Sequence, residues 1–363
     1  MTDTSAEGQL GKEAVEEGSE AGSVGTKGPK RDLGSLPQLR TLGRRLFEAD
    51  STGIFVALVV LVVVVGIIHP SFLSPNQLIQ VIQQATWIAI LAAGMAFLLA
   101  MLEIDLSVGA MLALTLVVAS MLDQGGMNPW LAALIAIGLG GVLGLVNALL
   151  VQFIGIPAIV ATLGTLSMYT GMAIALTGGE QITGIPTNNS FFNIVGGDVL
   201  GVPFDIWALI VMVIVLTVVL KLTPFGYRVR SIGSNPDAAT FSGISIRRVR
   251  VQALVMMGLL AGLAGELALA FYQSGDPEIG QNFELTAIAA AVIGGTSLRG
   301  GNATVIGAVV GAILLGMVNS ALVFFNVPLN WTSFAEGAVI IVAVSIDSLL
   351  RHQRGRRQRK LGL

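Results

Sequence analysis

The chain has 363 residues, of which 54% are hydrophobic and only 12% are charged, against about 25% charged in soluble domains. So few charges cannot cover a soluble protein, and long apolar runs recur from residue 53 to residue 350, which favours one polytopic membrane domain. The sequence has no cysteine and two histidines, which excludes disulfides and thiol nucleophiles and argues against a histidine-based catalytic or metal centre.

The first segment, residues 1–50, is rich in Gly, Ser, Glu and Lys and lacks periodicity, which predicts a disordered cytoplasmic tail. A membrane domain is then expected over 51–350. The last segment, 351–363, is strongly basic, and directly after a span such a tail is expected to touch anionic lipid rather than nucleic acid.

The apolar runs predict an all-α polytopic membrane protein with about ten transmembrane helices, because roughly 20 apolar residues cross a bilayer core about 30 Å thick. The expected spans lie near 53–68, 83–102, 106–122, 129–151, 157–177, 205–222, 251–272, 285–297, 303–325 and 331–350. The run 285–297 would reach only about 20 Å as a helix. We therefore expect it to be broken or re-entrant, or to borrow residues from its flanks.

The 20 Lys and Arg residues set the expected orientation. They lie before the first span, around 221–250, at Arg299 and after residue 350, and short cytoplasmic loops are the ones that retain such residues. With ten spans, both termini face the cytoplasm, and every basic cluster lies inside. The expected outward segments, which hold no Lys or Arg, are 69–82, 123–128, 178–204, 273–284 and 326–330.

Small residues are spaced about four apart in the stretches 139–146 and 306–316. In a membrane such stripes let helix backbones approach closely, so we expect them to be packing faces. Hinges of a moving transporter are the alternative interpretation.

Acidic residues inside the expected spans are Glu266 and Glu336. Ionisable groups at membrane depth are functional candidates by default, with protonated or hydrogen-bonded structural groups as the alternative. Asp105 and Ser107 occupy the tight turn after the second span, where capping of the next helix and substrate contact are both open. The turn 294–301, with sequence GGTSLRGG, is expected to be a tight cytoplasmic re-entry held by glycine.

Nucleotide hydrolysis needs a glycine-rich phosphate loop ending in GK[ST]. No lysine of the chain has that context. The chain is therefore not expected to hydrolyse ATP by that route, and no catalytic residue or metal site is expected.

The long cytoplasmic connection 223–250 predicts one short helix near 236–242. Asn235 is a good N-cap, Pro236 suits the first helical position, Asp237 favours the positive helix end, and Gly243 can close the helix in a left-handed conformation. Such a helix could be the binding site of a separate soluble partner, or it could be an ordinary amphipathic surface helix.

The sequence GSNPDAATFSGI (233–244) resembles the ATPase-docking loop of the permease subunits of ribose-type monosaccharide ABC importers. The stretches EIDLSVGAMLAL (103–114) and 283–322 are similar to two further motifs of that family, and weaker similarity runs through 156–179. The similarity covers most of 53–350. One departure is Glu103, where the family usually has a small residue, which marks either a different substrate or a tolerated change.

The resemblance implies a cell-membrane permease that pairs as a homodimer or heterodimer, binds two copies of an ATPase, and receives a monosaccharide from an extracytoplasmic binding protein. ATP and Mg would act on the ATPase, and this chain would bind no cofactor. The ATPase-coupling helix would comprise Asn235, Pro236, Asp237, Ala238, Ala239, Ser242 and Gly243.

A sugar pathway needs hydroxyl, amide and aromatic groups more than charges. The pathway or gate candidates are Asp105, Ser107, Thr165, Tyr169, Glu266, Thr296, Ser297 and Asn319, with interhelical hydrogen bonding as the alternative role. Within the family, a polyol, a nucleoside or a signalling sugar is the alternative solute. Outside it, the alternative is a stand-alone ion-coupled carrier that uses Glu266 and Glu336.

Overall fold

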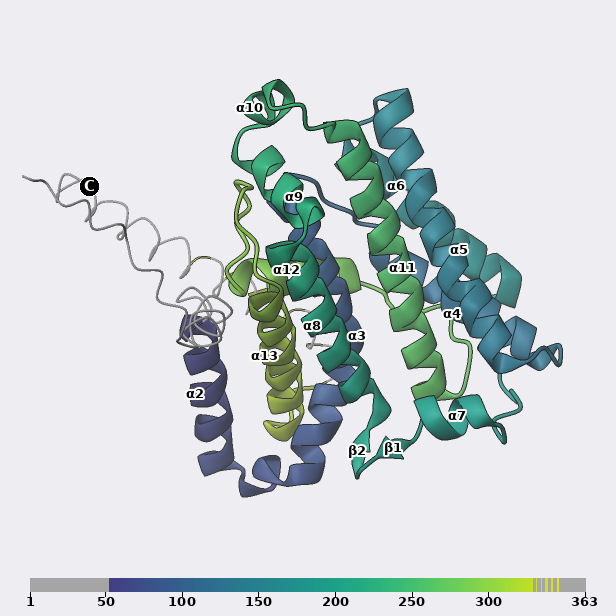
Figure 1. The fold of residues 1–363 in the computed structure, drawn as a ribbon. Coiled ribbons are helices and arrows are strands. Elements are labelled where there is room, and N and C mark those ends of the chain that lie inside the picture. Colours follow the sequence, from purple (N-terminus) through teal and green to yellow (C-terminus); the bar gives the residue numbers. More distant parts are fainter. Residues whose placement is uncertain are drawn as a thin grey trace, which may run out of the picture. The chain divides into compact units, whose positions relative to one another are not determined.

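The computed structural model describes residues 52–328 and six single positions beyond them. The expected tails at 1–50 and 351–363, most of the expected tenth span 331–350, and Glu336 lie outside the described residues. The described part is a bundle of helices with one small hairpin (Figure 1).

The longer helices are α2 (Thr52–Ile68), α3 (Pro75–Ala100), α4 (Val108–Gln124), α5 (Pro129–Leu149), α6 (Ala158–Thr177), α8 (Phe204–Leu222), α11 (Ile246–Tyr272) and α13 (Val305–Phe324). The shorter ones are η1 (Pro70–Leu73), η2 (Leu150–Ile154), α7 (Ser190–Val195), α9 (Pro224–Ser234), α10 (Pro236–Phe241) and α12 (Phe283–Ile293). Two short strands, β1 (Asp198–Val199) and β2 (Val202–Pro203), pair antiparallel with Asp198 opposite Pro203.

Among the described residues, 6 helical segments are long and apolar enough to cross a membrane, by length and composition. They are Pro75–Ala100, Pro129–Ile154, Ala158–Thr177, Phe204–Leu222, Ile246–Tyr272 and Val305–Phe324. Three shorter apolar helices, Gly53–Ile68, Val108–Gln124 and Phe283–Ile293, lie where the spans 53–68, 106–122 and 285–297 were expected. The polytopic helical architecture is confirmed, while the count of ten spans and their orientation stay predictions.

Two predicted boundaries were wrong. The helix expected to begin near residue 83 begins at Pro75, because Ser74 accepts a hydrogen bond from the Gln77 amide at 3.4 Å and Pro75 occupies the first turn. The connection 223–250 is not a loop with one short helix. It contains α9, which Thr223 caps through the Gly226 amide at 3.3 Å, then α10 and the first residues of α11.

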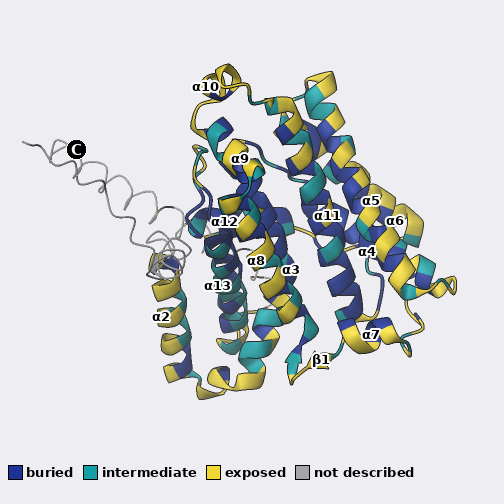
Figure 2. Ribbon diagram, viewed as in Figure 1, coloured by how far each residue is buried: buried dark blue, intermediate teal, exposed yellow. Residues whose placement is uncertain are grey.

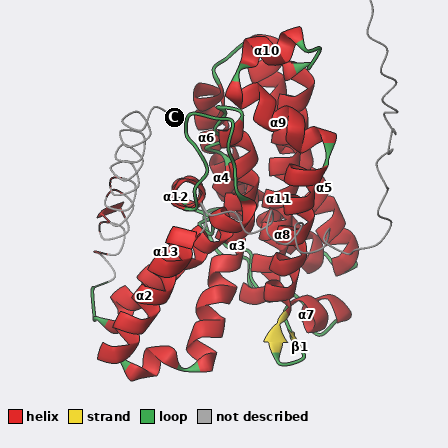
Figure 3. Ribbon diagram, turned by 60° about the vertical axis from the view of Figure 1, so that its left-hand side comes forward, coloured by secondary structure: helices red, strands yellow, loops and turns green. Residues whose placement is uncertain are grey.

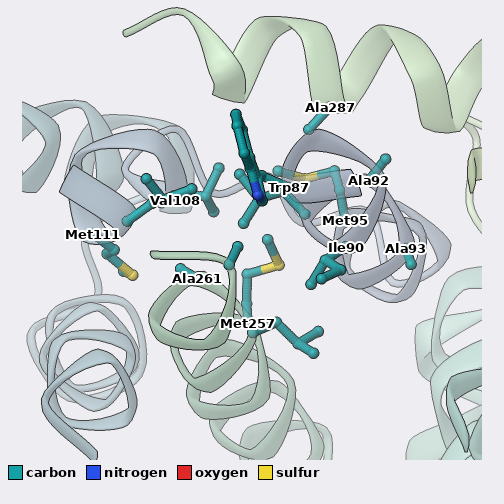
Figure 4. Packing of buried hydrophobic residues seen from close by; sticks show 14 of the residues in the cluster. Trp87, Ile90, Ala92, Ala93, Met95, Val108, Met111, Met257, Ala261 and Ala287 are labelled. Carbon is teal, nitrogen blue, oxygen red and sulfur yellow. The ribbon is translucent and has the colours of Figure 1, made fainter. Parts of the chain in front are cut away.

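The core forms around α3 and α11, whose facing sides are buried (Figure 2). Trp87 and Met95 of α3 pack with Met257 of α11 and Ala287 of α12 (Figure 4). By contrast, the outward faces of α2, α5, η2, α6 and α8 expose large apolar side chains, including Leu134 of α5 and Ile154 of η2, both 68% exposed. Apolar surface of this extent suits lipid or a protein partner rather than water.

Glycines bring α5 and α11 into backbone contact. A Cβ added at Gly140 would collide with the carbonyl oxygen of Gly258, and one at Gly144 with that of Leu254. On α13, Gly307 and Gly311 lie in the same way against the backbone of Gly294 and Ala290. Both predicted small-residue stripes are therefore packing faces, as helices in a membrane require.

The short helix α12 lies across the long helices instead of beside them, as the views in Figures 1 and 3 agree. It has 11 residues, Phe283–Ile293, which give it a length of about 16 Å. The expectation of a shortened element at 285–297 is confirmed, although its last four residues belong to the following turn.

Candidate functional site

The predicted capped helix is present as α10. The side chain of Asn235 accepts a hydrogen bond from the Ala238 amide at 3.0 Å, and Pro236 occupies the first turn. Gly243 follows the helix with φ of +80°, the left-handed conformation that the sequence predicted. Ala239 is buried, while Phe241 is 92% exposed. One side of α10 is therefore seated on the protein, and the other is open to a partner.

Helix α9 seats α10 on the bundle through backbone contact. Gly233 lies so close to Ala100, the last residue of α3, that a Cβ there would collide with the Ala100 carbonyl oxygen. The same carbonyl accepts a hydrogen bond from the Gly301 amide at 2.9 Å. The end of α9, the end of α3 and the turn 294–301 thus meet at one point.

The turn 294–301 has the predicted glycine conformations, with positive φ at Gly295, Gly300 and Gly301. Thr296 is fully buried, and its hydroxyl accepts a hydrogen bond from the Thr304 amide at 3.3 Å. The Ser297 hydroxyl accepts from the Arg299 amide at 3.1 Å. Both pathway candidates in this turn make hydrogen bonds that hold its backbone.

Three of the pathway candidates, Asp105, Ser107 and Tyr169, meet Asn147 in one buried network. The Asp105 carboxylate accepts hydrogen bonds from the Ser107 amide at 2.9 Å and the Ser107 hydroxyl at 2.7 Å. Asn147 of α5 donates from Nδ2 to Asp105 Oδ2 at 3.2 Å and to Ser107 Oγ at 2.8 Å. Tyr169 of α6 donates from its hydroxyl to the Leu143 carbonyl at 3.1 Å and lies 3.4 Å from Asn147 Oδ1.

This network ties the turn before α4 to α5 and α6. Asp105, Ser107 and Asn147 have no exposed surface, and a buried carboxylate is tolerated only where it is well hydrogen-bonded. Ser107 occupies the N-cap position of α4, and Asp105 lies two residues before it. The Asp105 carboxylate therefore holds the turn that precedes α4 and does not cap the helix itself. These contacts support the alternative role of Asp105, Ser107 and Tyr169, which is hydrogen bonding between helices and not contact with a sugar. Thr165, one turn before Tyr169, donates to the Thr162 carbonyl at 3.3 Å.

Glu103, in the turn between α3 and α4, pairs with Arg250 of α11. Burial raises the pKa of the Glu103 carboxyl, and the Arg250 guanidinium opposes that shift without cancelling it. The residue at which the sequence departs from the resembled motif is therefore an ion-pair partner of the first turns of α11.

Glu266 of α11 is 3% exposed, and neither of its carboxyl oxygens has a hydrogen-bond partner within the described part of the chain. Asn319 is half-buried on α13. Glu266 therefore takes no part in the hydrogen bonds of the Asp105 network. Within the described residues, no three or more His, Asp or Glu side chains are grouped so as to hold a metal ion.

The connection from α11 to α12 reaches deep into the bundle. Gly275 pairs with Ile182 and packs against Ser120 near the end of α4, whereas Gly280 packs against the backbone of Gly109 in the first turn of that helix. Gly109 and Ser120 are eleven residues apart, which is about 16 Å of helix rise. The segment 275–280 therefore follows much of the length of α4.

A cavity of about 170 Å³ lies where this segment meets α4 and α6. Its polar lining consists of Thr170, Gln281, Asn282 and Glu284, and its apolar lining includes Ala113 and Leu166. None of the predicted pathway residues lines it. The nearest sequence signal was Tyr169, the neighbour of Thr170 in the chain. The sequence did not locate the cavity, because the packing of 277–284 against α4 joins residues far apart in the chain.

A helical membrane protein with an irregular, polar-lined segment inside its bundle has the organisation of a transport protein. The model of a protein family described as the permease component of branched-chain amino acid transport systems matches residues 77–344. The chain belongs to this family of permeases, and it is a multi-pass protein of the cell membrane.

Three curated relatives have substrates in their names. The chain is 36% identical over 313 residues to a ribose import permease protein of Bacillus subtilis, which covers 85% of this chain and 97% of the relative. It is 33% identical to an L-arabinose ABC transporter permease protein of Azospirillum brasilense, over 84% of this chain and 89% of the relative. It is 31% identical to a D-allose transport system permease protein of Escherichia coli, over 83% and 92%. No solved structure matches the chain.

Proposed function

We propose that this chain is the permease subunit of an ATP-driven importer and forms the translocation pathway for a monosaccharide, a pentose or a hexose. The relatives named for ribose, L-arabinose and D-allose support this class of solute. The structural observation that carries the proposal is α10, a capped helix whose exposed side is free to bind a partner and whose support, α9, is in backbone contact with α3.

In this proposal, ten spans place both tails, α9 and α10 in the cytoplasm. Two copies of a separate ATPase bind at α10 of a homodimer or heterodimer, and ATP and Mg act on that ATPase. A binding protein delivers the sugar on the opposite side, to the loop 178–204 and to the adjoining residues 273–275, which Ser274 and Gly275 join to Gln181 and Ile182. This chain itself catalyses no reaction and binds no cofactor.

The proposed mechanism needs two states of the pathway that open to opposite sides, and a partner that binds one state better than the other. ATP-driven movement of the ATPase would reach the bundle where Gly233 touches Ala100 and where Gly301 bonds to the same residue. Because the backbones are closely packed at this point and packed interiors are hard to compress, movement of α9 would be transmitted to α3.

The test is uptake of labelled sugar by cells that produce the complete transporter. Gly243→Pro removes the amide that donates to the Thr240 carbonyl at 2.9 Å, and Asp237→Lys with Ala239→Asp reverses a charge and places a carboxylate at a buried position. Both variants should lose ATP-dependent uptake while still purifying as a single folded species. Asp237→Asn is the matched control and should retain most of the uptake. Wild-type uptake in the first two variants would contradict a coupling role for α10.

A further inference from the structure

We infer that the cavity between α4, α6 and the segment 277–284 is the site where the permease holds the sugar in transit. This inference rests on the proposed function and adds to it a location and a set of contacts. It excludes the Asp105 network as the sugar site, because the residues of that network are already bonded to one another and are sealed from the cavity by burial.

The position of the cavity along the bundle supports the inference. Leu166 and Thr170 both line it, and they lie near the middle of α6, Ala158–Thr177, a helix of membrane-spanning length. The facing segment 277–282 consists of turns instead of a helix. Irregular backbone at this depth is tolerated only where it is buried in protein or lines a water-filled cavity, and in transporters such interruptions mark the binding site.

The lining has the chemistry of a neutral polyhydroxylated solute. Gln281 and Asn282 provide amides, Thr170 a hydroxyl and Glu284 a carboxyl group, while Ala113 and Leu166 offer apolar surface to the face of a sugar ring. No Lys or Arg lines the cavity, so it has no group suited to an anionic solute. A volume of about 170 Å³ is below the roughly 300 Å³ at which sites for drug-sized ligands begin, which suits a small molecule.

Backbone geometry fixes the polar groups against α4. Gly280 and Asn282 have φ of +99° and +63°, so the chain turns sharply before α12. A Cβ at Gly109 would collide with the Gly280 carbonyl and would lie 2.8 Å from Glu284 Oε2. Glycine at positions 109 and 280 lets the Glu284 carboxyl reach the first turn of α4. A larger residue at either position would push the two segments apart.

The cavity is also adjacent to the parts of the protein that the proposed coupling would move. Gly109 lines it two residues after Ser107, and Thr170 lines it next to Tyr169. The Asp105 network therefore anchors two walls of the cavity without entering it. Movement of the turn before α4 would change the opening of the cavity directly.

Cysteine chemistry provides the test, because the natural chain has no cysteine. Leu166→Cys faces the cavity, and Met168→Cys, on the same helix but 60% exposed on its outer side, is the matched control. Each variant is assembled with its ATPase, in membranes containing ATP. A thiol-reactive sulfonate reagent is added with binding protein that is either empty or loaded with D-ribose, L-arabinose or D-allose, whichever the wild-type complex takes up fastest.

Loaded binding protein should slow the labelling of Leu166→Cys at least fivefold relative to empty binding protein, and should leave Met168→Cys unchanged. The comparison of loaded with empty protein removes any effect of ATP alone. Equal labelling rates with a transporting complex would overturn the location and leave the proposed function intact. If the wild-type complex takes up none of the three sugars in an ATP-dependent way, the proposed function fails instead.

A second measurement separates contact from folding. Glu284→Gln and Gln281→Ala should raise the KM for uptake about tenfold, while ATP hydrolysis stimulated by the binding protein stays near the wild-type rate. Unchanged KM in both variants would contradict sugar contact at this site, as would equal loss of uptake and of stimulated hydrolysis.

Discussion

The Glu103 carboxylate lies 2.7 Å from Nε of Arg250, which joins the turn before α4 to the first turns of α11. The Glu103 side chain is 8% exposed and that of Arg250 is 30% exposed, so the pair is partly shielded from water. Glu103 is the residue at which the sequence departs from the motif that it resembles, and Arg250, in the basic segment 221–250, provides the partner for its carboxylate.

We expect Glu103→Gln to lower the free energy of unfolding by about 1–3 kcal/mol, because it leaves a mostly buried guanidinium nitrogen without its charged partner. The same loss should follow Arg250→Gln. The exchanged pair, Glu103→Arg with Arg250→Glu, should recover at least half of it. Melting temperatures of the purified protein in detergent measure this series, and equal destabilisation in the exchanged pair and the single variants would show that the ion pair contributes nothing.

The Asp105 network makes a graded prediction. Tyr169→Phe removes one hydroxyl, which donates to the Leu143 carbonyl, and should cost about 1 kcal/mol. Asn147→Ala removes the donor to both Asp105 and Ser107, so it strands buried acceptors and should cost about 2–3 kcal/mol. Denaturation of the two variants in parallel gives the order, and a reversed order would contradict the network as described.

Glycine contacts between α5 and α11 can be tested within one helix. Gly140→Ala places a methyl group against the Gly258 carbonyl and should destabilise the protein by about 1–3 kcal/mol. Gly138 has nothing within 4 Å of a Cβ, so Gly138→Ala should be neutral or slightly stabilising, since alanine favours the helix. Equal yield and melting temperature for the two variants would contradict close packing at Gly140.

The contact between α9 and α3 makes a functional prediction. Gly233→Ala places a methyl group against the Ala100 carbonyl, which should displace α9 and lower ATP-dependent uptake at least tenfold. The comparison variant is Gly301→Ala, which is strained by its φ of +78° but approaches the Ser234 hydroxyl instead of Ala100. If α9 transmits the movement through Ala100, uptake per folded molecule should fall more in Gly233→Ala than in Gly301→Ala.

Local signals account for what the sequence predicted well. Asn235, Pro236 and Gly243 act within one short segment, so the caps of α10 could be read from the order of residues alone. The same kind of signal at Ser74 and Pro75 was available, but the polar residues that follow it resemble a loop, and the start of α3 was missed.

Long-range contacts account for what the sequence could not predict. In the sequence, Asp105, Asn147 and Tyr169 are far apart. They meet because α5 and α6 are oriented with Asn147 and Tyr169 facing the turn before α4, and the sequence does not report that orientation. The cavity depends on contact between Gly109 and Gly280, which no periodicity or spacing reports. Glu284 lay at the edge of an expected outward loop, yet the structure turns it toward α4.

The central claim is that this chain moves a sugar only as part of an ATP-driven complex. The most direct measurement is uptake of labelled sugar by proteoliposomes that contain the chain with or without its ATPase, with the loaded binding protein outside and ATP inside. We predict uptake only in the complete system, and inhibition of that uptake by vanadate. Uptake by the chain alone, driven by an ion gradient and insensitive to vanadate, would contradict the account and favour a stand-alone carrier.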